Sequence, residues 1–387
     1  MNTFPLSFYT VIPMRYCKKC VMPDTRPGIV FDAEGVCHAC RVAETRKSID
    51  WDKRFKELEK LCDKYRGKNG NYYDCIIAVS GGKDSHYQIY VMKELMHMNP
   101  LLVNVHNFSW TKTGYYNFNN MSEAFGCDII SLHLNRKIAK KFLWKALVKM
   151  GSPTWYWDKA VYVYPIRMGI NFKIPLIVYG ENISYEYGGF QKEETYSARD
   201  QINNDVVKAV DWDYWLDDDI TMKDLNPVIY PTPEEIKEAD IDPIYLSYFV
   251  QWDGYKNMEL AKKYGFKSLN DTGEWKREGY IEDYDQIDSK GYLVHPWLKY
   301  PKYGHARATD VSSYWIRTGR ITRDEGIELV KKNDYKLDKR ALQDFLDFVG
   351  HTEEEFWQAI DKFWNRDLFE KKHGKWVLKN PIWKEKI

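Results

Sequence analysis

The sequence predicts an α/β protein built on a doubly wound, mostly parallel sheet. Short apolar segments alternate with segments of helical periodicity between residues 75 and 180, a pattern typical of consecutive β-α-β units. A glycine turn joins the first apolar segment to the helix that follows it. With 44% hydrophobic residues among 387, the chain can also bury the large core that such a fold needs.

Four apolar segments are the expected strands of this sheet: CIIAVS at 75–80, LLVNV at 101–105, CDIISLHL at 127–134 and IPLIVYG at 174–180. Helices are expected at 86–98, 115–126, 136–150 and 157–172. The aromatic-rich segment YLSYFVQWD at 245–253 predicts a further strand. Ligands of such sheets bind beyond the carboxyl ends of the strands, so the loop after Val79 and the turn after Tyr179 are expected at one edge.

Five regions are expected along the chain. Residues 1–13 form an extension, 14–45 a compact cysteine-bearing segment, and 46–70 a connecting helix with apolar residues at helical spacing (Phe55, Leu58, Leu61 and Cys62). Residues 71–320 form the main α/β domain, with an acidic, irregular insertion or lid at about 191–240. Residues 321–387 are expected to be helical, because capping boxes at Thr322–Glu325 and Thr352–Glu355 each predict a helix start.

Charge and hydropathy exclude several classes of function. The formal net charge is +1, so no global field attracts nucleic acid or an anionic membrane. Residues 201–242 hold twelve Asp or Glu against three Lys or Arg, which repels a phosphate backbone locally. No apolar run reaches the roughly 18 residues of a membrane span, and residues 1–13 lack the basic start of a signal peptide. We therefore expect a cytoplasmic protein with neither a membrane nor a nucleic acid as partner.

The turn after the first strand has the composition of an anion-binding loop. It consists of Ser80, Gly81, Gly82, Lys83, Asp84 and Ser85, between a strand and a helix. Two glycines let the backbone approach a phosphate, while amides at the helix start point towards it. Lys83 supplies a positive charge, and Asp84 could hold Mg²⁺ that the phosphates also bind. The alternative is a Gly-Gly turn with incidental polar residues.

This loop is not a Walker A motif, which needs four residues between its glycines and then Lys followed by Ser or Thr. SGGKDS after an apolar strand instead resembles the PP-loop ATP pyrophosphatases, whose fold is of the adenine nucleotide alpha hydrolase type. The resemblance implies that ATP is a co-substrate cleaved between its α and β phosphates. It also implies that Ser80 to Ser85 bind the outer phosphates, with Lys83 and Asp84 as catalytic residues.

Two C-x-x-C pairs near the N-terminus predict a metal site. Cys17 and Cys20 are separated by sixteen residues from Cys37 and Cys40, a spacing that lets both pairs bind one tetrahedral Zn²⁺ as in a zinc ribbon. Four thiolates leave no open position for water or substrate, so this zinc is expected to be structural. Free thiols, a labile redox pair and an Fe-S cluster are the alternatives.

Motifs spread along the chain indicate a narrower family. The segments MRYCKKCVMPDTRPGI, AVSGGKDS, IPLIVYGEN, GHARATD and IRTGRITRDE together resemble the N-acetyl sugar amidotransferases of the WbpG/PseA type, from Met14 to about residue 350. The resemblance implies adenylation of the acetamido carbonyl of a sugar nucleotide, with a UDP-linked 2,3-diacetamido uronic acid as the expected acceptor. Ammonia then displaces AMP and leaves an acetamidino sugar, used in bacterial lipopolysaccharide O-antigen or flagellar glycan.

The resemblance also suggests substrate residues. Gly180, Glu181 and Asn182 match a GEN motif, in which Glu181 could bind Mg²⁺ or orient the acetamido nitrogen and Asn182 could bind the sugar amide; a plain strand-terminating turn is the alternative. Arg307 could pair with a uronate or diphosphate, although Arg307 and Asp310 could equally form a structural pair. His106 after the second strand could lie near adenine or ribose, or be an ordinary surface or core histidine.

The nitrogen source is expected to be another protein. A triad glutaminase needs Cys in a G-x-C-x-G turn, whereas Cys127 follows Phe125 and Gly126 and precedes Asp128; an N-terminal-nucleophile glutaminase needs Cys directly after the first Met, where Asn2 stands. Free ammonia is mostly protonated at neutral pH. The resemblance likewise implies a separate HisH-like glutaminase, with a HisF-like channel protein as a further candidate partner.

Two other functions compete with this hypothesis. Some tRNA thiolation enzymes also join zinc-binding cysteine pairs to a PP-loop, but this chain has near-zero charge and poor candidates for a sulfur carrier. Cys75 and Cys127 are expected in strands, and only Cys62 is expected to be exposed. The other alternative is a zinc-containing binding or scaffold protein with a degenerate nucleotide site, which the intact SGGKDS loop opposes.

Overall fold

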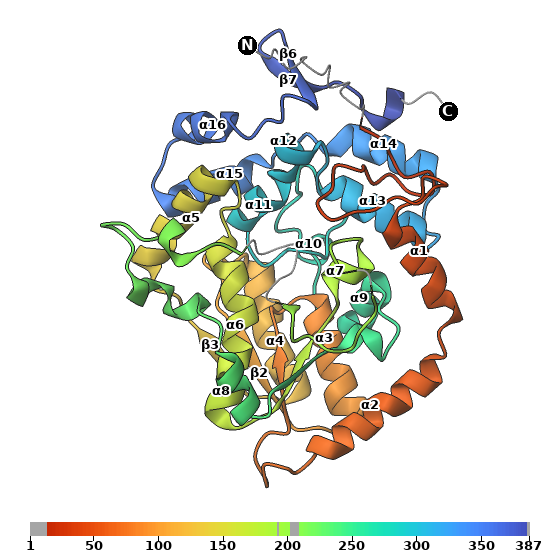
Figure 1. Ribbon diagram of the computed structural model, residues 1–387, viewed down its shortest axis with the longest axis vertical. Helices are drawn as coiled ribbons and strands as arrows, with labels where there is room; N and C mark the ends of the chain where they lie inside the picture. The colour runs from red at the N-terminus through yellow and green to blue at the C-terminus, as the bar shows by residue number, and fades with distance from the viewer. Residues whose placement is uncertain (1–13, 192, 202–208, 385–387) are drawn as a thin grey trace, which may run out of the picture.

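A five-stranded parallel sheet forms the centre of the protein, as the computed structural model of residues 14–191, 193–201 and 209–384 shows (Figure 1). Its strands are β1 (Cys75–Ala78), β2 (Pro100–Val105), β3 (Ile129–Leu132), β4 (Leu176–Tyr179) and β5 (Asp242–Tyr245), in the order β3-β2-β1-β4-β5. Every neighbouring pair in this sheet is parallel. The predicted α/β class is confirmed, and each of the first four predicted strands overlaps an observed one.

Helices cover both faces of the sheet. Successive strand residues point to opposite sides, so a run of apolar residues makes both faces apolar, and helices bury each of them. Ile77 of β1 packs against α2 (Trp51–Tyr65), α3 (Lys83–Ile89) and α4 (Lys112–Phe125). Ile76, its neighbour in the strand, packs on the other face against Ile166 of α6 (Trp155–Phe172). A π-helix at Tyr90–Leu95 continues α3. The sheet is therefore doubly wound, as the alternation of segments predicts.

The remaining helices complete the chain. They are α1 (His38–Thr45), α5 (Arg136–Met150), α7 (Ile183–Glu186), α8 (Pro233–Glu238), α9 (Gly254–Lys263), α10 (Leu269–Thr272), α11 (Val294–Trp297), α12 (Lys299–Tyr303), α13 (Arg307–Arg317), α14 (Arg323–Asn333), α15 (Lys339–Val349) and α16 (Glu353–Asp361). Both predicted capping boxes are present, at the starts of α14 and α16. Within the described ranges, no helix is both long and apolar enough to cross a membrane.

The strand order places the functional loops next to each other. The chain winds from β1 through β2 to β3 in one direction and then returns to β4, which lies on the other side of β1. The winding therefore reverses between β1 and β4. The carboxyl ends of the two strands at such a reversal flank the usual ligand crevice of an open α/β sheet.

The predicted strand at 245–253 is wrong in its position. The observed strand β5 occupies Asp242–Tyr245, and the chain then turns into a 3₁₀ helix at Leu246–Tyr248. Leu246, Phe249 and Val250 are buried at spacings of three and four residues, which suits a helical turn better than a strand. Pro243 is tolerated in β5 because this strand lies at the end of the five-stranded order.

The expectation that 321–387 is entirely helical is also wrong. Strands β6 (Phe369–Lys372) and β7 (Lys375–Leu378) form an antiparallel hairpin. Its two-residue turn consists of His373 and Gly374, both with positive φ, which is the backbone geometry that joins tightly paired strands. Residues 385–387 of this region lie outside the described residues, as do 1–13, the expected extension.

The acidic region at 191–240 is more than an exposed lid. In its described part, Trp215, Ile220, Leu225 and Val228 are buried and belong to the same apolar cluster as Phe142 and Tyr156. Trp215 packs edge-on against Phe142, with ring centroids 5.4 Å apart. Residue 192 and residues 202–208 of the region lie outside the described residues. The segment therefore contributes apolar side chains to the core as well as acidic ones to the surface.

The N-terminal cysteine segment packs against the C-terminal helices. Figure 1 shows this red segment beside α13 and α14 at the upper right. Val21 lies in one apolar cluster with Val330 of α14, and Arg323 donates a hydrogen bond to the carbonyl of Cys20 at 3.1 Å. The two ends of the sequence therefore stabilise each other.

Candidate functional site

The loop from Ser80 to Ser85 follows β1 and ends in the first residues of α3. The Ser80 amide donates to Ser85 Oγ at 2.9 Å, and the Gly82 amide donates to Ser80 Oγ at 3.3 Å. Gly81 has a φ of +93°, and a Cβ there would lie 2.9 Å from the Cα of Phe118. The first glycine of the loop thus gives both the turn and the close packing against α4.

Gly81→Ala is expected to lower the free energy of unfolding by about 1–3 kcal/mol, because the new methyl group is strained at this φ and meets the backbone of Phe118. Gly70→Ala is the matched control, since Gly70 has a φ of +65° but nothing lies within 4 Å of the place a Cβ would take there. Chemical denaturation measures both variants. If both variants lost the same free energy of unfolding, the contact with Phe118 would have no effect on stability.

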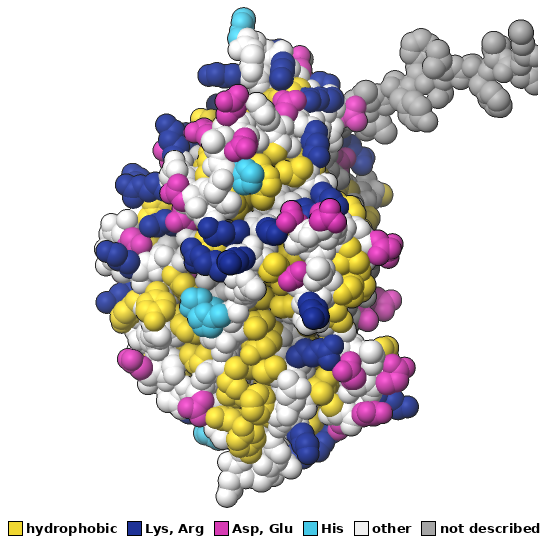
Figure 2. All heavy atoms as spheres, turned by 90° about the vertical axis from the view of Figure 1, so that its left-hand side faces the viewer, with side chains coloured by type: hydrophobic (Ala, Val, Ile, Leu, Met, Phe, Trp, Pro, Cys, Tyr) yellow, Lys and Arg dark blue, Asp and Glu magenta, His cyan; other side chains and the backbone are white. Residues whose placement is uncertain are grey.

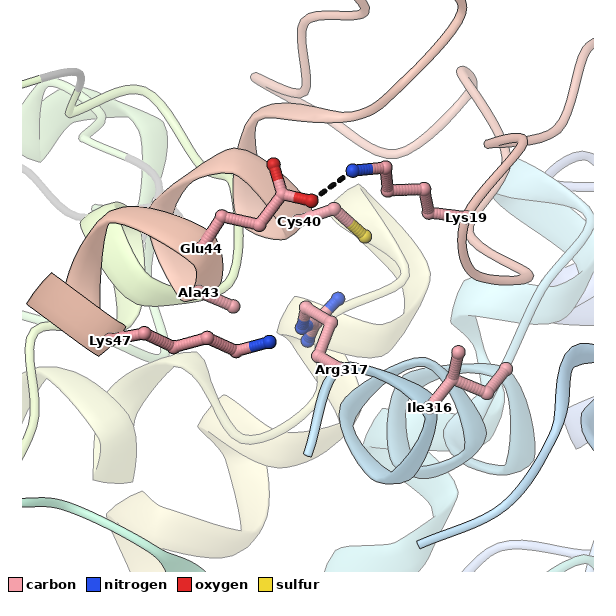
Figure 3. Close-up of a pocket in the computed structure, with 7 residues that line it drawn as sticks. All are labelled: Lys19, Cys40, Ala43, Glu44, Lys47, Ile316 and Arg317. Carbon is pink, nitrogen blue, oxygen red and sulfur yellow. Dashed lines mark hydrogen bonds and ion pairs between the residues drawn. The ribbon is translucent and has the colours of Figure 1, made fainter. Parts of the chain in front are cut away.

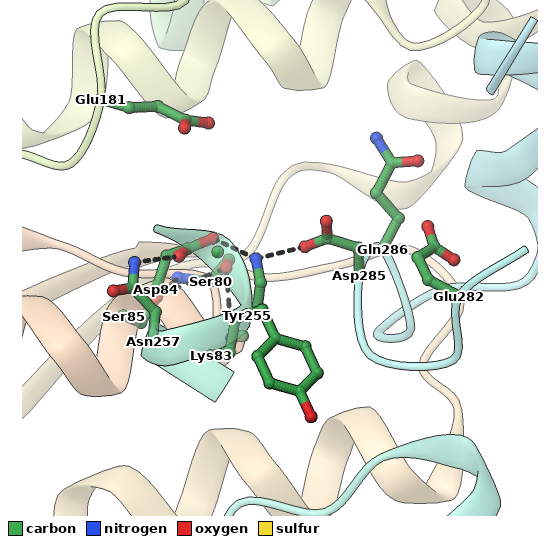
Figure 4. A network of polar contacts seen from close by, with 12 residues as sticks. Ser80, Lys83, Asp84, Ser85, Glu181, Tyr255, Asn257, Glu282, Asp285 and Gln286 are labelled. Atoms are coloured by element: carbon green, nitrogen blue, oxygen red, sulfur yellow. Dashed lines mark hydrogen bonds and ion pairs between the residues drawn. The ribbon is translucent and has the colours of Figure 1, made fainter. Parts of the chain in front are cut away.

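Lys83 lies buried between two carboxylates at the start of α3. Its Nζ is 2.6 Å from Asp84 Oδ2 and 2.5 Å from Asp285 Oδ1 (Figure 4). Burial alone lowers the pKa of Lys83, but the carboxylates of Asp285 and Asp84 outweigh it and raise the pKa above its ordinary value. Asn257 of α9 donates to Asp84 Oδ1 at 2.8 Å. Lys83 is therefore a fixed cation, and Asp84 is held in place from two sides.

Arg307 and Asp310 both lie at this site, each with its own partners. Arg307 Nη2 is 2.8 Å from Asp285 Oδ2, and Arg307 Nε is 3.2 Å from Glu282 Oε1. Asp310 instead forms an ion pair with Lys299 and lies 3.4 Å from Arg26 Nη1. The two residues are thus links of a larger charge network and not a simple structural pair, and a contact of Arg307 with a uronate or diphosphate stays a prediction.

Glu181 faces the phosphate loop from the end of β4. Figure 4 shows its carboxylate across the open space from Asp84 and Lys83. Its only hydrogen-bond donor among the described side chains is Tyr187, whose hydroxyl lies 2.7 Å from Oε2. Burial and then the negative charges of Asp84 and Glu186 raise the pKa of Glu181 to about 8. Two carboxylates that repel each other across a cavity suit Mg²⁺, which prefers such oxygen ligands.

The other two residues of the GEN segment have structural contacts. Asn182 caps α7: its Oδ1 accepts from the Tyr185 amide at 3.1 Å, and its Nδ2 donates to Gln191 at 3.0 Å. A Cβ on Gly180 would lie 2.9 Å from the Trp252 ring, and the Gly180 carbonyl accepts from the Ser247 amide. Of the three, Glu181 is the residue that lines the cavity.

A pH titration tests the environment of Glu181. Because the pKa of Glu181 is raised from 4.5 to about 8 in the folded protein, the carboxyl must take up a proton on folding in this pH range, and the free energy of unfolding falls as pH rises from 4.5 towards 8. Glu181→Gln removes this pH dependence. We therefore expect the free energy of unfolding of the metal-free variant, relative to metal-free wild type, to rise by a few kcal/mol from pH 5 to pH 8. Denaturation curves at both pH values measure the gain, with the exposed Glu59→Gln as control. A pH-independent difference would contradict the assignment.

A cavity of about 720 Å³ connects these side chains. The phosphate loop, Glu181 and Trp252 line one part, and residues of β2, α6 and the segment 284–315 are among those that line other parts. Arg26 and Pro27 reach the same cavity from the cysteine segment. Asp158 of α6 also lines it; burial raises the pKa of this carboxyl to about 7. The cavity is thus assembled from both ends of the chain and the sheet edge between them.

His106 follows β2 at the border of this cavity. Its neighbours Val105 and Asn107 line the cavity. Its own ring stacks on His133 with centroids 4.0 Å apart, and Trp110 Nε1 lies 3.1 Å from its Nε2. Burial, followed by the charge of His133, lowers the pKa of His106. A nucleotide contact by His106 therefore remains a prediction from the sequence.

The four cysteines of the N-terminal segment meet in one buried cluster. The Sγ atoms of Cys17, Cys20, Cys37 and Cys40 all lie within 4.8 Å of one another, with Cys17–Cys40 at 3.8 Å and Cys20–Cys37 at 3.7 Å. A tetrahedral site with Zn–S bonds of about 2.3 Å separates its sulfurs by about 3.8 Å. The amides of Lys19, Cys20 and Cys37 donate to Cys17 Sγ. The predicted cluster is confirmed, and its geometry fits zinc.

The charge around this cluster also suits a thiolate site. Figure 3 shows Arg317 of α13 below Cys40, in a small pocket beside the Lys19–Glu44 ion pair. The guanidinium of Arg317 favours the thiolate form of Cys20. Because four thiolates around Zn²⁺ carry a net negative charge, a half-buried arginine beside them lowers the cost of burying that charge.

The three remaining cysteines are all buried. Cys75 lies in β1 as expected, whereas Cys127 lies just before β3 and not in the strand. The expectation that Cys62 is exposed is wrong, because it lies on the inner face of α2 with no exposed surface. Burial raises the pKa of Cys62 to about 12 and that of Cys127 above its ordinary value. None of the three is thus a reactive thiolate, which argues against a sulfur carrier.

The surface charge is mixed on the face shown in Figure 2, where basic and acidic side chains are interspersed.

Several site residues carry no recognisable motif in the sequence. Asp285, Asn257 and Tyr187 contact Lys83, Asp84 and Glu181, and each comes from an irregular segment or a helix far from the loop. Asp285 is one of several acids in the run from Glu282 to Asp288, so only the fold distinguishes it.

Two comparisons with known proteins bear on this site. The chain is 30% identical to an uncharacterized protein of Methanocaldococcus jannaschii over 118 residues, which are 30% of this chain and 42% of that protein. Residues 278–382 match the family model described as "LPS biosynthesis protein WbpG-like, C-terminal domain". The matched region includes Asp285, Lys299, Arg307 and Asp310 of the cavity wall. This similarity to a WbpG-like C-terminal domain is confined to residues 278–382.

Proposed function

We propose that this chain is an ATP-dependent amidotransferase of polysaccharide biosynthesis. It adenylates the acetamido carbonyl of a sugar nucleotide, of which a UDP-linked diacetamido uronic acid is the leading candidate, and replaces the carbonyl oxygen with nitrogen from ammonia. The observation that carries the proposal is one cavity that joins the Ser80–Ser85 loop to a wall from the WbpG-like C-terminal region.

The proposed roles follow from the charges at this cavity. The loop amides, the Ser80 and Ser85 hydroxyls and Lys83 bind the outer phosphates of ATP. Asp84 and Glu181 would hold Mg²⁺, which would supply positive charge beside the departing pyrophosphate. Mg²⁺ and ATP belong to the proposal, as does zinc at the cysteine cluster.

The proposed reaction balances as two displacements. The carbonyl oxygen attacks the α phosphate of ATP, and pyrophosphate leaves. Ammonia then adds to the carbon of the O-adenylated imidate, AMP departs with the former carbonyl oxygen, and loss of a proton gives the amidine. An amide oxygen is a poor leaving group, whereas AMP is a good one, so adenylation is the step that makes the substitution possible. Ammonia comes from a separate HisH-like glutaminase, with a HisF-like protein as the candidate channel.

Product analysis tests the proposal. The protein is incubated with Mg²⁺, ATP, a high concentration of ammonium salt and a panel of acetamido sugar nucleotides. We expect AMP and pyrophosphate, together with a sugar nucleotide in which NH replaces O. Formation of ADP, or turnover that requires tRNA in a parallel arm, would contradict the proposal.

A further inference from the structure

The part of the cavity wall around α12 carries an excess of positive charge. Arg26 and Lys299 share one carboxylate, that of Asp310. Lys302 lines the same cavity one helical turn after Lys299, and the charge of Lys299 acts on it. Three cations therefore face the cavity with a single carboxylate among them.

Lys302 differs from the other two cations in its contacts, which include the ring of Tyr303 at 5.4 Å from its Nζ. Its Nζ donates to the Gly151 carbonyl at 2.8 Å, which uses one of its three hydrogens. Among the described residues, no carboxylate lies within ion-pair distance of it. Burial, followed by the charge of Lys299, lowers the pKa of Lys302 to about 8. A half-buried ammonium group without a counter-ion has an unfavourable desolvation free energy, which a negatively charged ligand can offset.

His305 beside this wall has unused hydrogen-bonding capacity. It is 1% exposed, lines the cavity, and neither ring nitrogen has a hydrogen-bond partner in the described structure. Asp310 Oδ1 lies 3.9 Å from Nδ1, too far for a hydrogen bond. Burial lowers the pKa of His305 to about 3, so the ring is neutral and offers one donor and one acceptor. Arg26 Nε is also buried without a partner among the described residues.

A line of alternating charges joins this wall to the phosphate loop. Lys83 contacts Asp285, and Asp285 contacts Arg307. The negative charge of Asp310 acts on Arg307, and Asp310 in turn pairs with Lys299. Positive and negative charges balance along this line. The excess of positive charge lies only at its end, around Lys302. The phosphate loop and the Lys302 wall are therefore two separate positions for anionic groups in one cavity.

We propose that Lys302, Lys299, Arg26 and His305 form a second anion subsite, which binds a phosphate or carboxylate group of the acceptor substrate. The inference rests on the proposed function for the identity of the acceptor, a sugar nucleotide. A diphosphate and a uronate carboxylate share the required chemistry. An anion fixed at the Lys302 wall holds the acceptor in the cavity while ATP occupies the loop, so the two substrates bind without competing.

Binding titrations with the loop filled test the subsite. Uridine diphosphate and glucuronate are titrated by calorimetry into protein saturated with Mg²⁺ and α,β-methylene-ATP, which occupies the phosphate loop without being cleaved. Lys302→Gln is expected to weaken binding of at least one probe by about tenfold or more, because a charge-assisted contact is lost. Lys302→Arg keeps the charge and is expected to retain most of the affinity. Lys332→Gln on the exposed end of α14 is the matched control.

The arms of this experiment separate the possible results. Weaker binding of uridine diphosphate alone assigns the subsite to the diphosphate, and weaker binding of glucuronate alone assigns it to the carboxylate. Wild-type protein that binds neither probe, or Lys302→Gln with unchanged affinity, overturns the proposal, as does Lys302→Arg with the same loss as Lys302→Gln. Arg26→Gln replaces Lys302→Gln if that variant does not fold. Failure to form AMP alongside intact anion binding would contradict the proposed reaction but not the subsite.

Discussion

Asp84→Asn is expected to lower the rate of AMP formation by about a hundredfold or more, because the uncharged side chain no longer holds Mg²⁺ at the phosphates. The fold is expected to remain, since the amide oxygen can still accept a hydrogen bond from one of the two present donors to Asp84, Lys83 and Asn257. Steady-state release of pyrophosphate measures the loss, and circular dichroism and zinc content report on the fold.

A control and a titration make this prediction specific. Asp52→Asn on the exposed side of α2 changes the same functional group far from the loop and is expected to leave turnover unchanged. If Asp84 binds the metal, raising the Mg²⁺ concentration is expected to restore part of the turnover rate of Asp84→Asn. Undiminished turnover of Asp84→Asn would remove the proposed metal role of this residue.

Cys37→Ser is expected to abolish stoichiometric zinc binding and to cost about 4–5 kcal/mol or more in the free energy of unfolding, since the segment 14–45 relies on the metal. The effect extends beyond the segment. Val21 packs on α14, and Arg26 reaches the cavity, so loss of the metal loosens both contacts. Plasma mass spectrometry of the purified protein and thermal denaturation measure the two effects.

Cys127→Ser is the matched control for thiol removal. Cys127 is also buried, but it lies just before β3, outside the cluster of Cys17, Cys20, Cys37 and Cys40. Its zinc content is expected to equal that of wild type. Full zinc occupancy in Cys37→Ser would show that the cluster does not bind zinc through four thiolates.

The sequence predicted those parts of the fold whose signals are local. The strand at Cys75–Ala78, the loop after it and the helix α5 follow from apolar runs, glycines and periodicity. The cysteine cluster follows from spacing alone, because two C-x-x-C pairs have few other stable arrangements in a reducing environment. The adjacency of the loops after β1 and β4 follows from a general rule of parallel sheets.

Other features depend on tertiary contacts that local patterns do not contain. The segment 245–253 has strand-like composition, but Leu246, Phe249 and Val250 are all buried by a helical turn. The charges of Asp285 and Lys299 meet Lys83 and Asp310 only after distant segments pack around one cavity. The surplus of charge at Lys302 is likewise a property of the assembled wall, and no spacing in the sequence indicates it.

The most direct test of the reaction uses an acceptor whose acetamido carbonyl oxygen is oxygen-18. If the loop at Ser80–Ser85 holds the outer phosphates while AMP is transferred to that oxygen, the label must leave with AMP, and mass spectrometry will find heavy AMP and unlabelled pyrophosphate. Label in inorganic phosphate or ADP, or label retained in the sugar while AMP accumulates, would contradict adenylation of the acetamido carbonyl.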